Sequence, residues 1–159
     1  MQSFETFANK EGEIIKIYLD CCSIQRPFDD KSQPRVAVEA EAILVVLSLC
    51  ESNQLGLISS DALLEINQIP DHLRKGDALK IIKLAKQHIE LTYEIEILAK
   101  EFETYGIKTL DALHLAFASV SKVDYFCTCD DKFMKKSKLL KNLNIKVASP
   151  TELVMELDL

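Results

Sequence analysis

The sequence predicts an α/β protein, a three-layer α/β/α sandwich around a central parallel sheet of about five strands. Short apolar segments suited to buried strands alternate along the chain with longer segments of helical periodicity. Strands separated by helices pair in parallel through right-handed crossovers, and helices then cover both faces of the sheet. The 159 residues show no internal repeat and include only four Gly and four Pro for linkers. We therefore expect a single domain over residues 1–159, with its core at about 14–157.

The first part of the chain is expected to contain a buried strand, a loop and a long helix. The strand is predicted at 14–19, a short run rich in β-branched and aromatic residues without polar alternation. Residues 21–34 include two prolines and two aspartates, which predicts a loop. Apolar residues then recur with helical spacing over 35–53. Their stripe is wide enough to need burial on two sides, by the sheet and by another subunit, so we expect a homodimer.

The middle of the chain gives the weakest strand signal. A short strand is expected at 55–59, followed by a helix over 61–69 that starts at a Ser-Asp N-cap and ends before a proline. Another helix is predicted over 73–87, and 88–91 is interpreted as a brief edge strand.

The last third alternates clearly between helices and strands. A threonine N-cap opens its first helix, a glycine ends that helix, and a Ser-Pro pair opens its last one. The expected elements are helices 94–105, 109–121, 131–140 and 150–156, with strands 124–128 and 145–147.

Composition narrows the class of protein. The net charge of −6, from 19 basic and 25 acidic residues, excludes a strongly basic nucleic-acid-binding protein, so any such contact must use a local patch. No apolar run approaches the roughly 18–20 residues of a membrane span, and the polar, acidic N-terminus is unlike a signal peptide. The odd number of cysteines predicts reduced, buried thiols in a cytoplasmic protein without membrane association. They are Cys21, Cys22, Cys50, Cys127 and Cys129.

Four acidic residues carry the main functional signal. They are Asp20, Glu65, Asp111 and Asp130. Asp20 and Asp130 each follow an expected strand, and parallel sheets bind ligands beyond the carboxyl ends of their strands. Glu65 and Asp111 lie on expected helices, with enough chain between them to fold back toward those ends. Taken one at a time, the four are also explained as helix caps, a turn residue or surface charges.

Taken together, the four carboxylates predict a metal site. Carboxylates gathered at one point repel one another unless a cation holds them. Ligands that are all oxygen select Mg²⁺ or Mn²⁺ over zinc. Such an ion can generate hydroxide from bound water and stabilise charge on a phosphodiester during in-line attack. The leading hypothesis from the residues is therefore a metal-dependent nuclease.

At these residues the sequence resembles the PIN domain (the PilT N-terminal nuclease family), best known from VapC-type toxin ribonucleases. The matching segments are IYLDCCSI, ISSDALLEI, TLDALHLAFAS and YFCTCDDKF. They follow the family's order and span nearly the whole chain. The family's usual Asp-Thr-Asn start is Asp20, Cys21 and Cys22 here, which changes the hydrogen bonding expected after Asp20.

The resemblance implies a sheet ordered 3-2-1-4-5, with the strands before Asp20 and Asp130 side by side. It implies that the four acids bind one or two Mg²⁺ or Mn²⁺ ions, that Thr128 positions the site, and that Asp131 is an additional acid. It also implies an RNA substrate, endoribonuclease activity and a small antitoxin partner.

Four basic residues are candidates for substrate binding. They are Arg26, Arg35, Lys132 and Lys135. The lysines belong to a cluster after Asp130 that could contact an RNA backbone, although a solvated helix face is the simpler explanation. His114 is expected to pack beside Asp111, three residues away on the same helix face, and to hydrogen-bond locally.

Two other classes of function remain open. The first is a non-catalytic PIN-fold module that binds RNA or protein, against which the presence of all four acids argues. The second is a phosphotransferase or phosphatase with an acid after its first strand. The haloacid-dehalogenase type needs a second Asp two residues later, where this sequence has Cys22.

Overall fold

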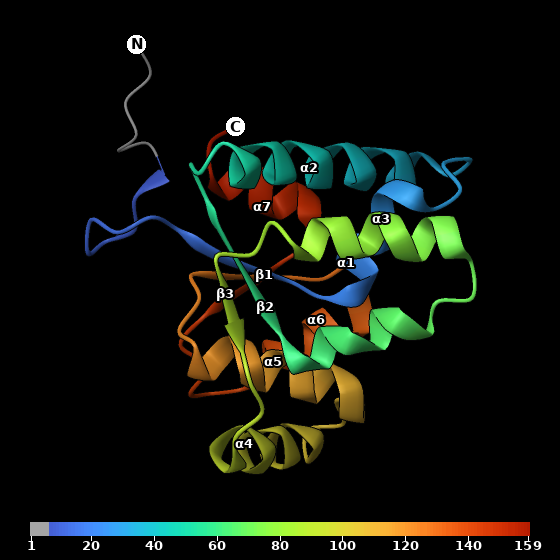
Figure 1. Cartoon of the computed structure of the whole chain (residues 1–159). Helices are drawn as coiled ribbons and strands as arrows, with labels where there is room; N and C mark the ends of the chain where they lie inside the picture. The colour runs from blue at the N-terminus through green and yellow to red at the C-terminus, as the bar shows by residue number, and fades with distance from the viewer. Residues whose placement is uncertain (1–6) are drawn as a thin grey trace.

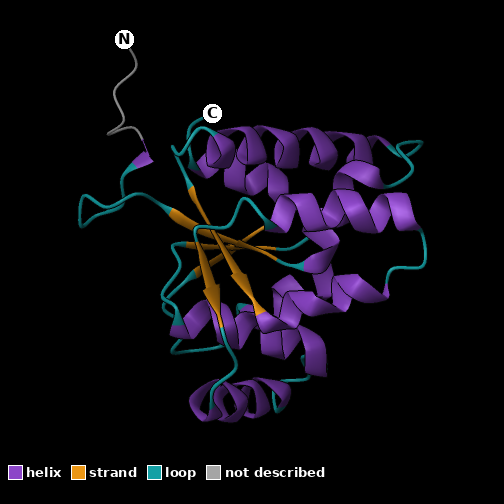
Figure 2. Cartoon of the chain, in the orientation of Figure 1, coloured by secondary structure: helices purple, strands orange, loops and turns teal. Residues whose placement is uncertain are grey.

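The computed structural model describes residues 7–159 and has the expected α/β/α layers (Figures 1 and 2). Five strands form one sheet in the order β3-β2-β1-β4-β5, and every neighbouring pair is parallel. This order confirms the 3-2-1-4-5 prediction. The strands are β1 (Lys16–Leu19), β2 (Gly56–Ser60), β3 (Gln87–Ile89), β4 (Tyr125–Cys127) and β5 (Lys146–Ala148).

Helices cover both faces of the sheet. The α-helices are α1 (Cys21–Gln25), α2 (Pro34–Glu51), α3 (His72–Ile82), α4 (Tyr93–Glu103), α5 (Thr109–Val120), α6 (Asp131–Ser137) and α7 (Pro150–Glu156). Two 3₁₀ helices are η2 (Arg26–Phe28) and η3 (Asp61–Gln68). Helices α2 and α7 pack together on one side of the sheet, and α4 and α5 pack together on the opposite side (Figure 1). Within the described residues, no helix combines the length and the apolar character that a membrane crossing needs.

The centre of the core is a row of aromatic rings that fixes β1, β4 and α6 to one another. Tyr18 stacks on Phe126 with ring centroids 5.4 Å apart, and Phe126 meets Phe133 edge to face at 5.6 Å. All three rings are buried, and each such pair contributes about 0.5–1.5 kcal/mol beyond the area it buries. Tyr18 is two residues before Asp20, and Phe133 is three residues after Asp130. The stack therefore sets where these two acids lie.

Strand register brings the ends of β1 and β4 level with each other. Leu19 pairs with Cys127, and the next amide, that of Asp20, donates to the carbonyl of Cys127 at 3.2 Å. Because parallel strands place their carboxyl ends on one edge of the sheet, the residues after β1 and β4 meet there.

The predicted loop over 21–34 was wrong in its first half, which forms α1 and η2. Asp20 caps α1, since its side chain accepts from the amide of Ser23, and Pro27 occupies the first turn of η2. A proline is tolerated at that position because the amide it lacks has no helical partner there. Pro27 and Asp29, which predicted turns, therefore mark the beginning and the end of a short helix.

Other boundaries differ by a few residues. The helix predicted over 73–87 ends at Ile82, and the edge strand β3 lies at Gln87–Ile89 rather than 88–91. Strand β1 starts at Lys16, because Ile14 forms an isolated antiparallel bridge with Ala8. The helix predicted over 131–140 ends at Ser137 as α6.

Candidate functional site

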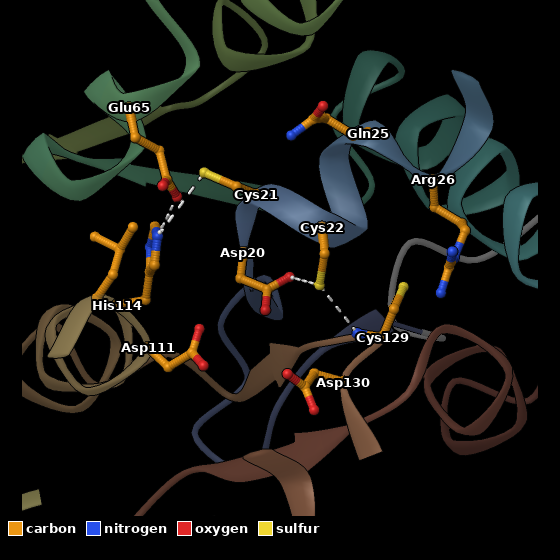
Figure 3. A pocket seen from close by; sticks show the side chains of 11 residues that line it. Asp20, Cys21, Cys22, Gln25, Arg26, Glu65, Asp111, His114, Cys129 and Asp130 are labelled. Atoms are coloured by element: carbon orange, nitrogen blue, oxygen red, sulfur yellow. Dashed lines mark hydrogen bonds and ion pairs between the residues drawn. The ribbon is translucent and has the colours of Figure 1, made fainter. Parts of the chain in front are cut away.

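A pocket of about 370 Å³ lies where β1 and β4 end (Figure 3). It contains all four acids that the sequence singles out. Its lining residues are Asp20, Cys21, Cys22, Gln25, Arg26, Glu65, Leu110, Asp111, His114, Cys129 and Asp130. They come from the β1–α1 junction, the end of α1 and the start of η2, from η3, from the first turns of α5 and from the β4–α6 junction.

Asp20 and Asp130 share one local design. Each is a helix N-cap, and each uses Oδ1 for the cap. Oδ1 of Asp20 accepts from the amide of Ser23 at 3.0 Å, and Oδ1 of Asp130 accepts from the amides of Lys132 and Phe133 at 3.0 and 3.1 Å. Within residues 7–159, neither Oδ2 atom has a hydrogen-bond partner. The simple explanation of Asp130 as a cap is thus correct, and Asp20, which was explained as a turn residue, is a cap as well; each cap leaves one carboxylate oxygen free for a ligand.

Asp111, in the first turn of α5, is close enough to Asp20 and Asp130 for their charges to affect its pKa. Burial, followed by the negative charges of Asp20 and Asp130, raises the pKa of Asp111 to about 6. Burial and neighbouring like charges both disfavour the ionised form of a carboxyl group, and a bound cation would favour it. Asp20, Asp111 and Asp130 face the same space in Figure 3. They form the aspartate group of the pocket.

Glu65 belongs to a different group of contacts, centred on His114. Oε1 of Glu65 lies 3.0 Å from Nε2 of His114. The other ring nitrogen of His114, Nδ1, lies 2.7 Å from the hydroxyl of Tyr18, which lies 2.6 Å from Oγ of Ser60. Partial burial alone would raise the pKa of Glu65, but hydrogen bonds from His114 and Cys21 outweigh it, so the pKa lies below its ordinary value.

His114 was expected to hydrogen-bond locally beside Asp111, and this detail was wrong. Although both residues lie in the first turns of α5, the imidazole spans from β1 to η3 instead, through Tyr18 and Glu65. His114 is only 2% exposed, so its two ring nitrogens need hydrogen-bond partners inside the protein. Asp111 is not one of these partners.

Two cysteines stand where the PIN resemblance leads one to expect Thr and Asn, and both have polar contacts. The thiol of Cys22 donates to Oδ1 of Asp20 at 3.0 Å, and its sulfur accepts from the amide of Cys129 at 3.4 Å. Sγ of Cys21 lies 3.8 Å from Nε2 of His114. Burial, together with the neighbouring charge of Glu65, raises the pKa of the Cys21 thiol.

The expectation of buried thiols therefore holds only for part of the set. Cys50, Cys127 and Cys129 are buried, whereas Cys21 is half-buried and Cys22 is exposed. The prediction failed for the last two because α1 begins at the pocket and presents its first residues to it (Figure 3).

Thr128 and Asp131 occupy different surroundings. Thr128 is fully buried, and its Oγ1 accepts from the amide of Asp130 at 3.1 Å, so it shapes the turn that carries this acid. Asp131 does not line the pocket. It forms a two-pronged ion pair with Arg35, with distances of 2.7 and 2.8 Å, on the wall of a neighbouring cavity of about 540 Å³. The Arg35 guanidinium lowers the pKa of Asp131.

The four basic residues proposed to bind substrate do not lie together: only one of them lines the pocket. Arg26 lines the pocket and is ion-paired with Asp29 at 3.0 Å and with the buried Glu39 at 3.1 Å. Lys132 is exposed and lines a small cavity of about 40 Å³ beside Asp111 and Asp130. Lys135 is exposed on α6. Arg35 lies outside the pocket, held by Asp131.

Sequence reasoning missed Tyr18, Ser60 and Glu39. The sequence did indicate burial of Glu39, since it lies between Val36 and Ala40, which both belong to the predicted apolar stripe. In the structure Glu39 is only 2% exposed. Tyr18 and Ser60 gave no such signal. Tyr18 looks like an ordinary strand residue and Ser60 like a helix cap, and only the fold shows that the Tyr18 hydroxyl contacts both His114 and Ser60.

The aspartate group fits a hard divalent cation. It offers free carboxylate oxygens, mutual repulsion that a cation would relieve, and a pocket open to solvent. The other group, formed by Cys21, Glu65 and His114, offers three different ligand atoms within 4.8 Å of one another. The two groups differ in chemistry although they share one pocket.

Among the comparisons with known proteins, only the comparison of structures found a similar protein, and the similarity shows the fold alone. No family model and no curated protein matches the sequence. Among solved structures, a chain from "Crystal structure of VapBC2 from Rickettsia felis bound to a DNA fragment from their promoter" is similar, with a TM-score of 0.56 and 16% sequence identity. The alignment covers 85% of this chain and 98% of that one. The present chain therefore has a PIN-like α/β fold, as its motifs predicted.

Proposed function

We propose that this protein is a Mg²⁺- or Mn²⁺-dependent endoribonuclease. The observation that carries the proposal is the aspartate group, in which Asp20 and Asp130 each keep a free oxygen, and in which burial and then the charges of these two residues raise the pKa of Asp111 to about 6. Three carboxylates from separate parts of the chain, Asp20, Asp111 and Asp130, repel one another in this pocket, and a bound divalent cation would relieve that repulsion.

In this proposal Asp20, Asp111 and Asp130 would hold the cation. When bound, the ion supplies a nucleophilic hydroxide and stabilises charge on a phosphodiester. The caps of α1 and α6 keep the carboxylates of Asp20 and Asp130 in place, because each carries backbone hydrogen bonds on Oδ1. Thr128 supports the same turn through the amide of Asp130.

RNA would approach over the exposed edge of the pocket. Lys108 and Lys132 line the small cavity next to Asp111 and Asp130, where their ammonium groups can attract backbone phosphates. Arg26 also lines the pocket, but it is already engaged by two carboxylates and so contributes less free charge. The overall charge of −6 makes such a local patch necessary.

Glu65 is the fourth proposed ligand, and its position is less favourable. It would reach the cation after leaving His114, or through a bridging water. This observation favours a second candidate, a non-catalytic PIN-fold module that binds RNA or protein. In the endoribonuclease a bound cation would support RNA cleavage, whereas in the binding module it would bind without any cleavage.

A toxin role with a protein partner is part of the proposal. The similar structure is a VapBC2 complex, which supports an antitoxin as partner. Helix α2 also exposes Val38, Leu44 and Val45, which supports burial of this face in a homodimer or against a partner.

Incubating the purified protein with a labelled RNA of mixed sequence, in Mn²⁺ and in excess EDTA, tests the proposal. An endoribonuclease gives internal cleavage that needs Mn²⁺. Mn²⁺ binding measured by calorimetry without any cleavage would instead support the binding module.

A further inference from the structure

The part of the pocket next to Asp111 also gathers a thiol, an imidazole and a carboxylate (Figure 3). Sγ of Cys21, Nε2 of His114 and an oxygen of Glu65 all lie within 4.8 Å of one another. These atoms come from α1, α5 and η3, three separate segments of the chain. We propose that Cys21, Glu65 and His114 form a site for a thiophilic divalent cation, best matched by Zn²⁺.

The spacing of the three atoms suits a tetrahedral ion. Zn–N and Zn–O bonds of ~2.0 Å and a Zn–S bond of ~2.3 Å place neighbouring ligand atoms roughly 3.3–3.5 Å apart. The observed separations are 3.0 Å from Nε2 of His114 to Oε1 of Glu65 and 3.8 Å from Nε2 to Sγ of Cys21. Small rotations of the Cys21 and Glu65 side chains complete the geometry, and neither residue is fully buried.

The histidine is prepared for this role by its second nitrogen. Metal-binding histidines almost always direct their other ring nitrogen to a fixed partner, which selects the tautomer and orients the ring. Here Nδ1 of His114 lies 2.7 Å from the Tyr18 hydroxyl, which can accept from Nδ1–H and turn its own hydrogen to Ser60 at 2.6 Å. Without metal, Nε2–H donates to Glu65; metal binding would select the tautomer with the proton on Nδ1 and leave Nε2, which lies beside Glu65 and Cys21, free to coordinate.

Ligand chemistry separates this site from the aspartate group. Sulfur and imidazole nitrogen favour zinc, whereas sites made only of oxygen favour Mg²⁺ or Mn²⁺. The side chain of Glu65 is 30% exposed and the pocket is open, so an ion can enter and keep a water as its fourth ligand. Three protein ligands and one water make an open site.

The consequence for activity rests on the proposed function. Zinc at Cys21, Glu65 and His114 would hold Glu65 beside His114 and deny it to a cation on the aspartate group. We therefore expect Zn²⁺ to inhibit cleavage that Mn²⁺ supports. The binding site itself does not depend on nuclease activity, so its test uses no RNA.

Titration of the reduced full-length protein with Co²⁺, which reports zinc-like sites by absorption, tests the proposal. The wild type should show a thiolate-to-cobalt charge-transfer band in the near ultraviolet, and one equivalent of Zn²⁺ should abolish it. Cys21→Ser should lose the band and weaken Zn²⁺ binding by at least about 10- to 100-fold, the loss that even an outer partner of a metal ligand causes. Cys50→Ser, which removes a buried thiol on α2, should keep the band.

Two results would overturn the proposal. One is the absence of the band in wild-type protein, which needs no variant to fold. The other is a band that persists in Cys21→Ser but disappears in Cys22→Ser, since the thiolate would then be the neighbour that contacts Asp20. Failure of Mn²⁺-dependent RNA cleavage with an intact band would remove the proposed function and leave the zinc site standing.

Discussion

The Nε2 atom of His114 lies 3.0 Å from Oε1 of Glu65, so the only glutamate among the described residues of the pocket is hydrogen-bonded to an imidazole and stands apart from the aspartate group. This contact divides the pocket into an oxygen-only side and a side of mixed ligands. Substitutions on the oxygen-only side should therefore change Mn²⁺ binding, and substitutions on the mixed side should change Zn²⁺ binding.

The pH dependence of stability should reveal the aspartate group. The pKa of Asp111 is raised from 3.8 to about 6 in the folded protein, so the folded state binds this proton more tightly than the unfolded state. Without metal, the ionised Asp111 should destabilise the folded protein fully above the folded pKa, and this penalty should be relieved as the pH falls from about 7 toward 4. Urea unfolding in EDTA across this range measures it, and an identical pH slope in Asp111→Asn would contradict the assignment.

Asp111→Asn should stabilise the metal-free protein at pH 7.5. Removing the repelled charge is worth about 1–2 kcal/mol once solvent screening of this half-buried group is allowed for. That corresponds to a rise in Tm of roughly 2–8 °C for a chain of this size. The same variant should lose most of the Tm increase that Mn²⁺ gives the wild type. A variant that keeps that increase would show that Asp111 is not a ligand.

The two adjacent aspartates at the start of α6 should behave differently. Asp130→Asn keeps the helix cap but removes a charged ligand, so Mn²⁺-dependent cleavage should fall by about 100-fold or more. Asp131→Asn breaks only an ion pair with Arg35 outside the pocket, and its cleavage rate should stay within about twofold. Equal losses in the two variants would mean that Asp131 reaches the metal, as the PIN resemblance implies.

Cys22 should act on the metal site through Asp20. Its thiol donates to Oδ1 of Asp20, so Cys22→Ala should weaken Mn²⁺ binding by about tenfold while Cys22→Asn, which restores a donor, should preserve it. Calorimetric titration with Mn²⁺ compares the two variants. Equal affinities for both would exclude a positioning role for this thiol.

Tyr18→Phe should weaken the proposed zinc site by about tenfold, because it removes the hydroxyl that orients His114 and keeps the ring that stacks on Phe126. Competition for Zn²⁺ with a coloured chelator gives the affinity. Unfolding in the absence of zinc is the control, since the lost hydrogen bonds to His114 and Ser60 also cost stability. A loss of stability with unchanged zinc affinity would leave Tyr18 a purely structural role.

The fold was predictable because its signals are local and repeated. The apolar run before Asp20, the one before Asp130 and the helices between them predict a parallel sheet, and the motifs around the acids imply its order. The segment 21–34 was mispredicted because its prolines and aspartates serve equally well in turns and in short capped helices. Choosing between these needs the packing of α1 against its neighbours.

The candidate site was predictable in composition but not in arrangement. The four acids all reach the pocket, and Asp20 and Asp130 do so because strand register dictates it. The pairing of Glu65 with His114 depends on side-chain rotamers across η3, α5 and β1, which no pattern in the sequence encodes. The ion pair of Arg35 with Asp131 likewise depends on how α2 meets α6.

The rate of RNA cleavage in Mn²⁺ by the wild type, Asp20→Asn and Asp71→Asn tests the central claim most directly. Asp71 caps α3 outside the pocket through Oδ1, as Asp20 caps α1, so the two substitutions make the same chemical change at equivalent local sites. We predict Mn²⁺-dependent cleavage by the wild type and Asp71→Asn, and its loss in a folded Asp20→Asn. Equal cleavage by Asp20→Asn would contradict a metal-dependent active site in this pocket.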